Sequence, residues 1–245
     1  MLISPQMNIK SQIPNVITLG NLLCGAFSVY FVTQNNLALA ALLILAGAFL
    51  DFFDGMSARL LKVSGELGKQ LDSLADLISF GLAPAFIAMH FAGAFANDVA
   101  FSIWAFTPVI IAPFAAYRLA KFNIDTRQTS DFIGMATPSN ALFWLSIPLI
   151  LAYSNTESGL GTVYLHFSES VLAVNIAAVF ISILMVSEIR FFSLKFNSLK
   201  WSGNEFRYVL ILSSIILLFV FHVQALPIIL LLYFILSLIY HFTRK

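Results

Sequence analysis

Four aspartates stand where two strongly apolar segments of the chain meet. Asp51 and Asp54 lie near the end of one segment, and Asp72 and Asp76 follow the start of the next. Residues three or four apart share one face of a helix, so each pair can point its carboxylates to the same side. Two such helices joined by a short loop would bring four acids into one pocket. Unpaired charges there would be costly, so the pattern predicts a bound cation.

The ligand type indicates which cation this is. Carboxylate oxygens suit hard divalent ions such as Mg²⁺ or Mn²⁺, which typically bridge protein acids and substrate phosphates. The chain has no cluster of Cys and His for zinc, because its one cysteine, Cys24, lies inside the first apolar run and its four His have no ligand spacing. In phosphoryl transfer the metal would hold the diphosphate while one acid takes a proton. The spacing alone does not say which acid that is.

The elements that must position these acids are membrane-spanning helices. The chain of 245 residues is 60% hydrophobic and only 10% charged, whereas soluble domains contain about 25% charged residues. At about 20 residues per span, there is no room for a separate soluble domain. The predicted apolar runs are 14–33, 37–61, 71–96, 99–121, 138–154, 169–188, 207–223 and 226–242. We predict an all-α polytopic membrane bundle of about eight spans.

The distribution of charge predicts the orientation. With both termini in the cytoplasm, all 13 Lys and Arg fall on the cytoplasmic side, and the opposite connections contain Asp98, Glu157 and Glu169 but no basic residue. This asymmetry follows the positive-inside rule. It places the aspartates at the cytoplasmic face of the cytoplasmic (inner) membrane. The first run lacks the features of a cleaved signal peptide, so we expect it to be retained as a span.

The spacing D-x2-D-G-x2-A-R-x8-G-x3-D-x3-D resembles the signature of the CDP-alcohol phosphotransferase family. Every fixed position of that signature is filled by Asp51, Asp54, Gly55, Ala58, Arg59, Gly68, Asp72 and Asp76. The resemblance implies that Asp51, Asp54 and Asp72 are metal ligands. It also implies that Asp76 is the catalytic general base and touches the metal as well.

The same resemblance implies a nucleotide site. Small residues leave room for a nucleotide, and an Arg can donate to its phosphates. The implied nucleotide and diphosphate site comprises Gly55, Ala58, Arg59, Gly68, Thr18 and Asn21. For Thr18 and Asn21, which are three residues apart in the first apolar run, a hydrogen bond that only packs helices together is an open alternative.

The end of the fourth run resembles the R-x-A-R-F-N segment of the phosphatidylserine synthase branch of that family, and the stretch 185–196 is also similar to that branch. The residues predicted to bind an acceptor serine or a lipid phosphate are Arg118, Lys121, Asn123 and Arg190. Lys121 replaces an Arg of the pattern, which keeps the charge but loses the two-pronged geometry.

Taken together, the resemblance implies an enzyme that transfers the phosphatidyl group of CDP-diacylglycerol to L-serine. We expect an interfacial segment 1–13, a six-helix catalytic core over 14–200 and a transmembrane hairpin over 201–245. A homodimer in the lipid bilayer is implied, and no nucleic-acid partner is expected.

Two alternatives stay open. A sister enzyme would use glycerol 3-phosphate or an inositol phosphate as its acceptor, and would need more Arg around the acceptor pocket than the chain offers. A divalent cation or proton-coupled transporter would also need acids in the membrane. A transporter would want polar residues that continue to the far side, whereas these acids stop at one face.

Overall fold

The computed structural model describes residues 9–63, 65–95, 102–125, 127, 131–157, 159–194, 196 and 200–243. The helices and strands are α1 (Ile9–Thr33), α2 (Leu37–Leu61), α3 (Glu66–Asp76), the π-helix η1 (Leu77–Leu82), α4 (Ala83–Phe91), the 3-10 helix η2 (Ile103–Ile110), α5 (Ile111–Ile124), β1 (Phe132–Ile133), α6 (Thr137–Tyr153), α7 (Leu160–Glu169), α8 (Val171–Val186), β2 (Arg190–Phe191), α9 (Glu205–Phe221), the 3-10 helix η3 (His222–Gln224) and α10 (Ala225–Thr243). The all-α prediction is confirmed. Of the predicted segment 1–13, residues 1–8 lie outside the described residues.

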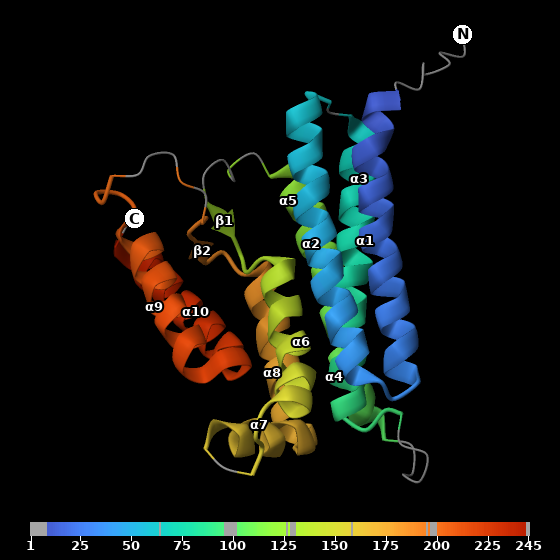
Figure 1. The fold of residues 1–245 in the computed structure, drawn as a ribbon, viewed down its shortest axis with the longest axis vertical. Helices are drawn as coiled ribbons and strands as arrows, with labels where there is room; N and C mark the ends of the chain where they lie inside the picture. Colours follow the sequence, from blue (N-terminus) through green and yellow to red (C-terminus); the bar gives the residue numbers. More distant parts are fainter. Residues whose placement is uncertain are drawn as a thin grey trace.

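Helices α1 and α2 form a close antiparallel pair beside α3 (Figure 1). The side chain of Asn36 accepts a hydrogen bond from the Leu39 N–H at 3.2 Å and thereby caps α2. Ala40 and Gly47 are buried on α2, and the Ser28 hydroxyl of α1 donates to the Ala40 carbonyl at 2.9 Å. Small residues allow such close approach of helices in lipid.

A π-helical turn follows Asp76 directly and connects α3 to α4. Ser79 in this turn donates its hydroxyl to the Asn21 carbonyl of α1 at 2.8 Å. Asn140 of α6 donates its side-chain amide to the Phe80 carbonyl, also at 2.8 Å. Such wide turns occur frequently at functional sites. Here two buried side chains fix the backbone next to an aspartate of the signature.

Gly25 of α1 packs against this turn, and its substitution provides a test of the packing. A Cβ at Gly25 would lie 2.7 Å from the Cα of Ser79 and 2.8 Å from its backbone nitrogen. We expect Gly25→Ala to destabilise the protein by about 2 kcal/mol, because overpacking forces the backbones apart, and to lower the midpoint of thermal unfolding in detergent.

Gly20→Ala on the same helix is the matched control. Its Cβ would meet only the flexible end of Leu50 at 3.2 Å, while Ala gains up to about 1 kcal/mol over Gly in helix propensity. Its unfolding midpoint should stay near that of the unmodified protein. Equal midpoints for the Gly25 and Gly20 variants would contradict tight packing at Ser79.

A two-residue antiparallel strand pair joins the segment before α6 to the segment after α8. Ile133 of β1 lies opposite Arg190 of β2. Gly134 follows with a φ of +80°, and a Cβ there would lie 2.3 Å from the Met185 carbonyl oxygen. Only glycine fits such a position. The strand pair therefore brings Arg190 beside the start of the loop that leads into α6.

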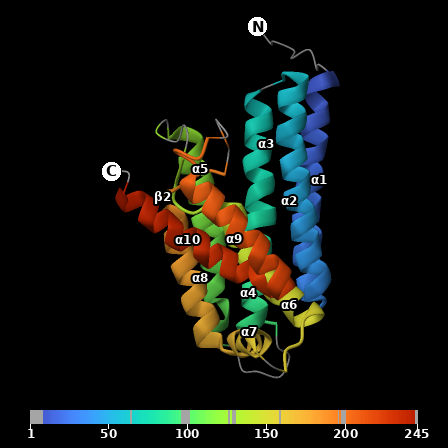
Figure 2. The ribbon, with the colours of Figure 1, turned by 60° about the vertical axis from the view of Figure 1, so that its left-hand side comes forward.

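The C-terminal part differs from the upright bundle. Helices α7 and α8 are bent by 91° relative to each other, and α7 lies across one end of the molecule (Figure 1). Helices α9 and α10 form the predicted two-helix hairpin, which turns at His222 (Figure 2). Phe234 of α10 packs edge-on against Phe180 of α8, with 5.9 Å between ring centroids.

Among the described residues, five helical stretches are long and apolar enough to cross a membrane, or six if the bent pair α7–α8 is one span. Eight were predicted. Helix α6 has 17 residues, which is below the usual length of about 20. The hairpin forms one of the five stretches, Glu205–Thr243, although it turns back on itself. The chain is an integral membrane protein, and the cytoplasmic location of its termini stays a prediction.

Candidate active site

Three aspartates of the signature come together between α2 and α3. Asp51 of α2 and Asp72 and Asp76 of α3 each offer a carboxylate oxygen, and these three oxygens lie within 4.8 Å of one another. Asp72 and Asp76 share a face of α3 because they are four residues apart. None of the three forms an ion pair with a Lys or Arg of the described residues.

Asp54 is buried on the side of α2 that faces α1. Its Oδ2 accepts a hydrogen bond from the Thr18 hydroxyl at 2.5 Å, and the same hydroxyl lies 3.0 Å from the Pro14 carbonyl oxygen. A hydroxyl has one proton, and a bond to an ionised carboxylate is the stronger of the two. Asp54 is not among the three aspartates whose oxygens lie together, so its place as a fourth metal ligand stays a prediction.

Asn21 connects α1 to Asp76. It is fully buried, and its side-chain amide donates to Asp76 Oδ1 at 3.4 Å. A Cβ at Gly47 would lie 2.8 Å from Asn21 Oδ1, so the glycine makes room for this side chain. The structure thus gives Thr18 and Asn21 contacts with the acids, and their predicted contact with a nucleotide stays a prediction.

The small residues of the signature border the acids. A Cβ at Gly55 would meet no heavy atom of the described residues within 4 Å, whereas one at Gly68 would lie 3.3 Å from Asn15 Oδ1. Ala58 is half-buried, and Arg59 is exposed at the end of α2. Packing against another helix therefore does not explain the glycine at position 55. The predicted nucleotide role of this group stays a prediction.

The predicted acceptor residues of α5 contact three different parts of the fold. Buried Arg118 donates Nε to the Met135 carbonyl at 2.8 Å, and its guanidinium carbon lies 5.3 Å from the centre of the Phe122 ring. The Asn123 side-chain amide donates to the Ser73 hydroxyl of α3 at 2.7 Å. The end of α5 is therefore tied to the helix that carries Asp72 and Asp76.

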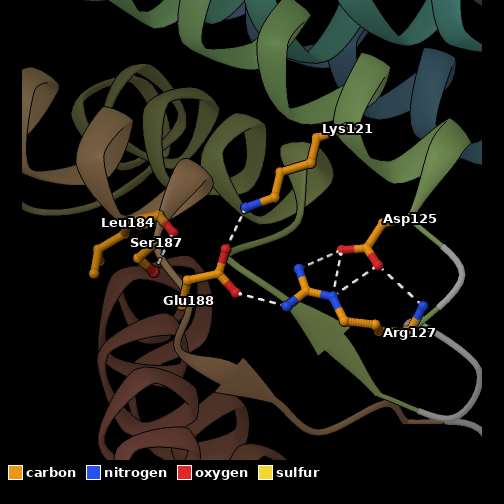
Figure 3. A network of polar contacts seen from close by, with 6 residues as sticks. All are labelled: Lys121, Asp125, Arg127, Leu184, Ser187 and Glu188. Atoms are coloured by element: carbon orange, nitrogen blue, oxygen red, sulfur yellow. Dashed lines mark hydrogen bonds and ion pairs between the residues drawn. The ribbon is translucent and has the colours of Figure 1, made fainter.

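Lys121 belongs to a chain of ion pairs that connects α5 to the segment after α8 (Figure 3). Its ammonium lies 2.5 Å from Glu188, which also pairs with Arg127 at 3.4 Å, and Arg127 pairs with Asp125 at 2.7 Å. The hydrogen bond from Lys121 lowers the pKa of Glu188 below its usual range. The hydrogen bond with Asp125 raises the pKa of Arg127, which therefore stays protonated. Both partners of the pair between Arg127 and Glu188 are exposed, so that pair contributes little to stability.

A cavity of about 420 Å³ opens beside these ion pairs. It is lined by Arg127, Asp131, Ile133, Glu188, Arg190 and His241. Arg190, the last predicted acceptor residue, lines this cavity from β2, and its contact with an acceptor stays a prediction. Asp131 and His241 are not among the site residues that the sequence predicts. Strand pairing and the packing of α10 bring them together, and no short-range pattern predicts either.

The donor set of the aspartates fits a divalent cation. Three carboxylates this close repel one another when ionised, and the described residues supply no cation that pairs with them. All three offer oxygen atoms only, which is the preference of Mg²⁺ and Mn²⁺. The residues present are therefore suited to hold such an ion.

Comparison with known proteins agrees with this chemistry. The CDP-alcohol phosphatidyltransferase family model matches residues 11–184. A CDP-diacylglycerol–serine O-phosphatidyltransferase of Bacillus subtilis is 39% identical over 130 residues, which cover 51% of this chain and 69% of that protein. One of Helicobacter pylori with the same name is 34% identical over 158 residues, which cover 63% of this chain and 65% of that protein.

A further relative of that name, from Mycobacterium leprae, is 31% identical over 138 residues, or 53% of this chain and 44% of that protein. The matches therefore span about two thirds or less of these relatives' length. The family model, in contrast, spans most of the chain and includes all eight fixed residues of the signature, from Asp51 to Asp76. The chain belongs to the CDP-alcohol phosphatidyltransferase family.

Proposed function

We propose that the protein transfers the phosphatidyl group of CDP-diacylglycerol to the hydroxyl of L-serine, giving phosphatidylserine and CMP. The observation that carries this proposal is the group formed by Asp51, Asp72 and Asp76 inside the family signature. The choice of serine is supported by the printed names of the relatives. It is also supported by residues 118–123 of α5, which resemble the R-x-A-R-F-N segment of the phosphatidylserine synthase branch.

The ion would be Mg²⁺ or Mn²⁺, held by Asp51, Asp72 and Asp76, with Asp54 as the fourth ligand. When bound, it supplies positive charge that holds the diphosphate and neutralises the departing phosphate. Thr18 keeps Asp54 oriented through its hydroxyl. Asn21 does the same for Asp76.

Asp76 takes the proton in the transfer step. The serine hydroxyl oxygen forms a bond to the phosphorus that carries diacylglycerol, and its proton passes to the Asp76 carboxylate. The bond between that phosphorus and the oxygen of CMP breaks, and CMP leaves with the electron pair. The buried Asn21 amide donates to Asp76 Oδ1 and so holds one oxygen of this carboxylate. The Asp76 carboxylate also lies close to those of Asp51 and Asp72.

The nucleotide would lie at the end of α2. Gly55 adds no side chain there, Ala58 and Gly68 add little bulk, and exposed Arg59 can donate to phosphate. The lipid chains would remain in the bilayer. The protein would lie in the cytoplasmic (inner) membrane, with its active site facing the cytoplasm. A homodimer is part of this proposal by family resemblance only.

A radiochemical assay tests the proposal. Purified protein in detergent should release CMP from CDP-diacylglycerol only when L-serine and Mg²⁺ or Mn²⁺ are both present. The matched control replaces serine with glycerol 3-phosphate or inositol phosphate at equal concentration. Phosphatidyl transfer to either of these, and not to serine, would keep the family and overturn the proposed acceptor. Cation flux into liposomes without CMP release would instead favour a transporter.

A further inference from the structure

The C-terminal hairpin lies beyond the part of the chain that the family model matches. That model ends at residue 184, whereas α9 begins at Glu205 and α10 ends at Thr243. The site residues that the sequence predicts all precede the hairpin in the chain. The hairpin nevertheless lies beside the strand pair formed by β1 and β2 (Figure 1). Its polar contacts with these strands therefore need an explanation of their own.

One face of α10 holds the strand pair by hydrogen bonds. Tyr233 and Tyr240 are seven residues apart, so they lie on the same face of the helix, two turns from each other. The Tyr233 hydroxyl donates to the Phe192 carbonyl, directly after β2, at 3.0 Å. The Tyr240 hydroxyl donates to Asp131 Oδ2, directly before β1, at 2.8 Å. Each strand is therefore held at one end by a tyrosine hydroxyl of α10.

Both helices of the hairpin also contact β2 and the residues that follow it. The Arg190 backbone N–H donates to His241 Nδ1 of α10 at 3.2 Å. Arg207 of α9 donates its Nε to the Ser193 carbonyl at 2.5 Å. The side chain of Phe192, which lies between these two contacts in the sequence, is buried. The hairpin therefore fixes the whole segment that begins with β2.

The strand pair in turn positions the backbone that holds Arg118. The Gly134 N–H donates to the Ile189 carbonyl at 2.9 Å. The Met135 N–H donates to the Leu184 carbonyl at 3.0 Å. The Met135 carbonyl then accepts the hydrogen bond from Arg118 Nε at 2.8 Å. Because these bonds follow one another along the chain, a displaced strand pair would displace the carbonyl that holds the guanidinium.

Arg118 connects this arrangement to the aspartates. Its side chain is buried, and its guanidinium lies within electrostatic range of the Asp76 carboxylate and of the Tyr233 hydroxyl. The guanidinium is planar and rigid, so its position decides which oxygen atoms it can contact. A misplacement of about 1 Å in an active site can cost about 10²-fold in rate.

We infer that the C-terminal hairpin positions Arg118 for the transfer step, with Tyr233 and Tyr240 as positioning residues. This inference rests on the proposed function, for which Arg118 is predicted to bind the acceptor or a lipid phosphate. The two hydroxyls act through the strand pair and the Met135 carbonyl. The hairpin thereby gains a role in the reaction, in addition to the apolar surface that it contributes to the bilayer.

Removal of the two hydroxyls, with both rings kept, tests this inference. In the full chain in detergent, we expect the double variant Tyr233→Phe/Tyr240→Phe to lower kcat/KM for serine by about tenfold or more. Tyr164→Phe is the matched control, because its hydroxyl donates to the Gln224 carbonyl at the turn of the hairpin, also at 3.0 Å. This control loses the same kind of bond away from the strand pair, and its kcat/KM should stay within about twofold.

The same substitutions in an Arg118→Gln background identify the group that they act through. The double tyrosine variant should change kcat/KM there by less than about twofold, because the guanidinium that the hydroxyls position is already absent. A loss of equal size in both backgrounds would mean that the hydroxyls do not act through Arg118, and would overturn the inference. A normal kcat/KM in the double tyrosine variant alone would also overturn it.

Hydrogen exchange measured by mass spectrometry follows the same contacts without turnover. The N–H groups of Gly134 and Met135 are hydrogen-bonded, and a weakened strand pair opens more often. Exchange in the peptide 131–135 should be about tenfold faster in the double tyrosine variant and normal in Tyr164→Phe. Equal exchange in the double variant and the unmodified protein would contradict a hold of the hairpin on the strands.

The failures of the two proposals are distinguishable. Serine-dependent CMP release by the unmodified protein, with normal kcat/KM and normal exchange in the double tyrosine variant, would overturn the role of the hairpin and keep the proposed function. Transfer to glycerol 3-phosphate in place of serine would overturn the proposed acceptor. If that transfer then fell in the double tyrosine variant, but not in the Arg118→Gln background, the role of the hairpin would be kept.

Discussion

Asp76→Asn is expected to lower the rate of CMP release by about 10²–10⁴-fold, the usual contribution of a general base. Asparagine has nearly the same shape and keeps an oxygen that accepts the hydrogen bond from Asn21. It cannot take the proton of the serine hydroxyl. The rate should be measured in a single turnover at saturating serine and metal, so that the proton transfer and not substrate binding is compared.

Glu66→Gln is the matched control for this variant. Glu66 lies on the same helix, is exposed, and accepts a hydrogen bond from Gln70 at 2.8 Å. The same chemical change there should leave the rate within about twofold, because exposed substitutions usually have small effects. A normal rate in Asp76→Asn would mean that another acid takes the proton.

The grouping of the acids was predictable because it depends on short-range geometry. Asp72 and Asp76 are four residues apart on one helix, and a short loop returns the chain so that Asp51 meets them. Hydropathy likewise predicted each helix that carries the site. What hydropathy does not detect is a bend, and the 91° angle between α7 and α8 is the clearest example.

The contacts that hold the acids were not predictable in detail. The sequence predicts for Thr18 either a nucleotide contact or a hydrogen bond that packs helices together, but it does not identify the partner, Asp54, which is 36 residues away. The π-helical turn after Asp76 depends on hydrogen bonds from other helices, including that of Asn140. Such contacts follow from the packing of whole helices. Sequence spacing within one helix carries no signal for them.

The same reason explains why the cavity was missed. The sequence predicts that Arg190 binds the acceptor, but it does not predict that β2 pairs with β1 or that the Arg190 backbone N–H donates to His241 of α10. Asp131 is an ordinary loop aspartate in the sequence, and only the Tyr240 hydroxyl identifies it. Histidines such as His241 were given no chemistry because no ligand spacing surrounds them.

Removal of divalent cations should reduce CMP release by roughly 10³-fold or more, since metal stabilisation of phosphoryl transfer amounts to several kcal/mol. Treatment with EDTA, followed by addition of Mg²⁺ or Mn²⁺, should abolish and then restore the rate. The physical reason is the repulsion among Asp51, Asp72 and Asp76, none of which forms an ion pair with a Lys or Arg of the described residues. Full activity in EDTA would contradict a metal role for this group.

Single substitutions then show which acids hold the ion, through a signal that does not need turnover. Asp51→Asn and Asp72→Asn should raise the Mn²⁺ concentration for half-saturation at least about tenfold, because a lost ligand charge weakens oxygen coordination. Electron paramagnetic resonance of free Mn²⁺ measures this directly, with Glu157→Gln as the control. Asp54→Asn is the informative case, because its carboxylate is engaged by Thr18. A tenfold shift there would make Asp54 the fourth ligand, and an unchanged Mn²⁺ affinity would limit its role to holding α1 against α2.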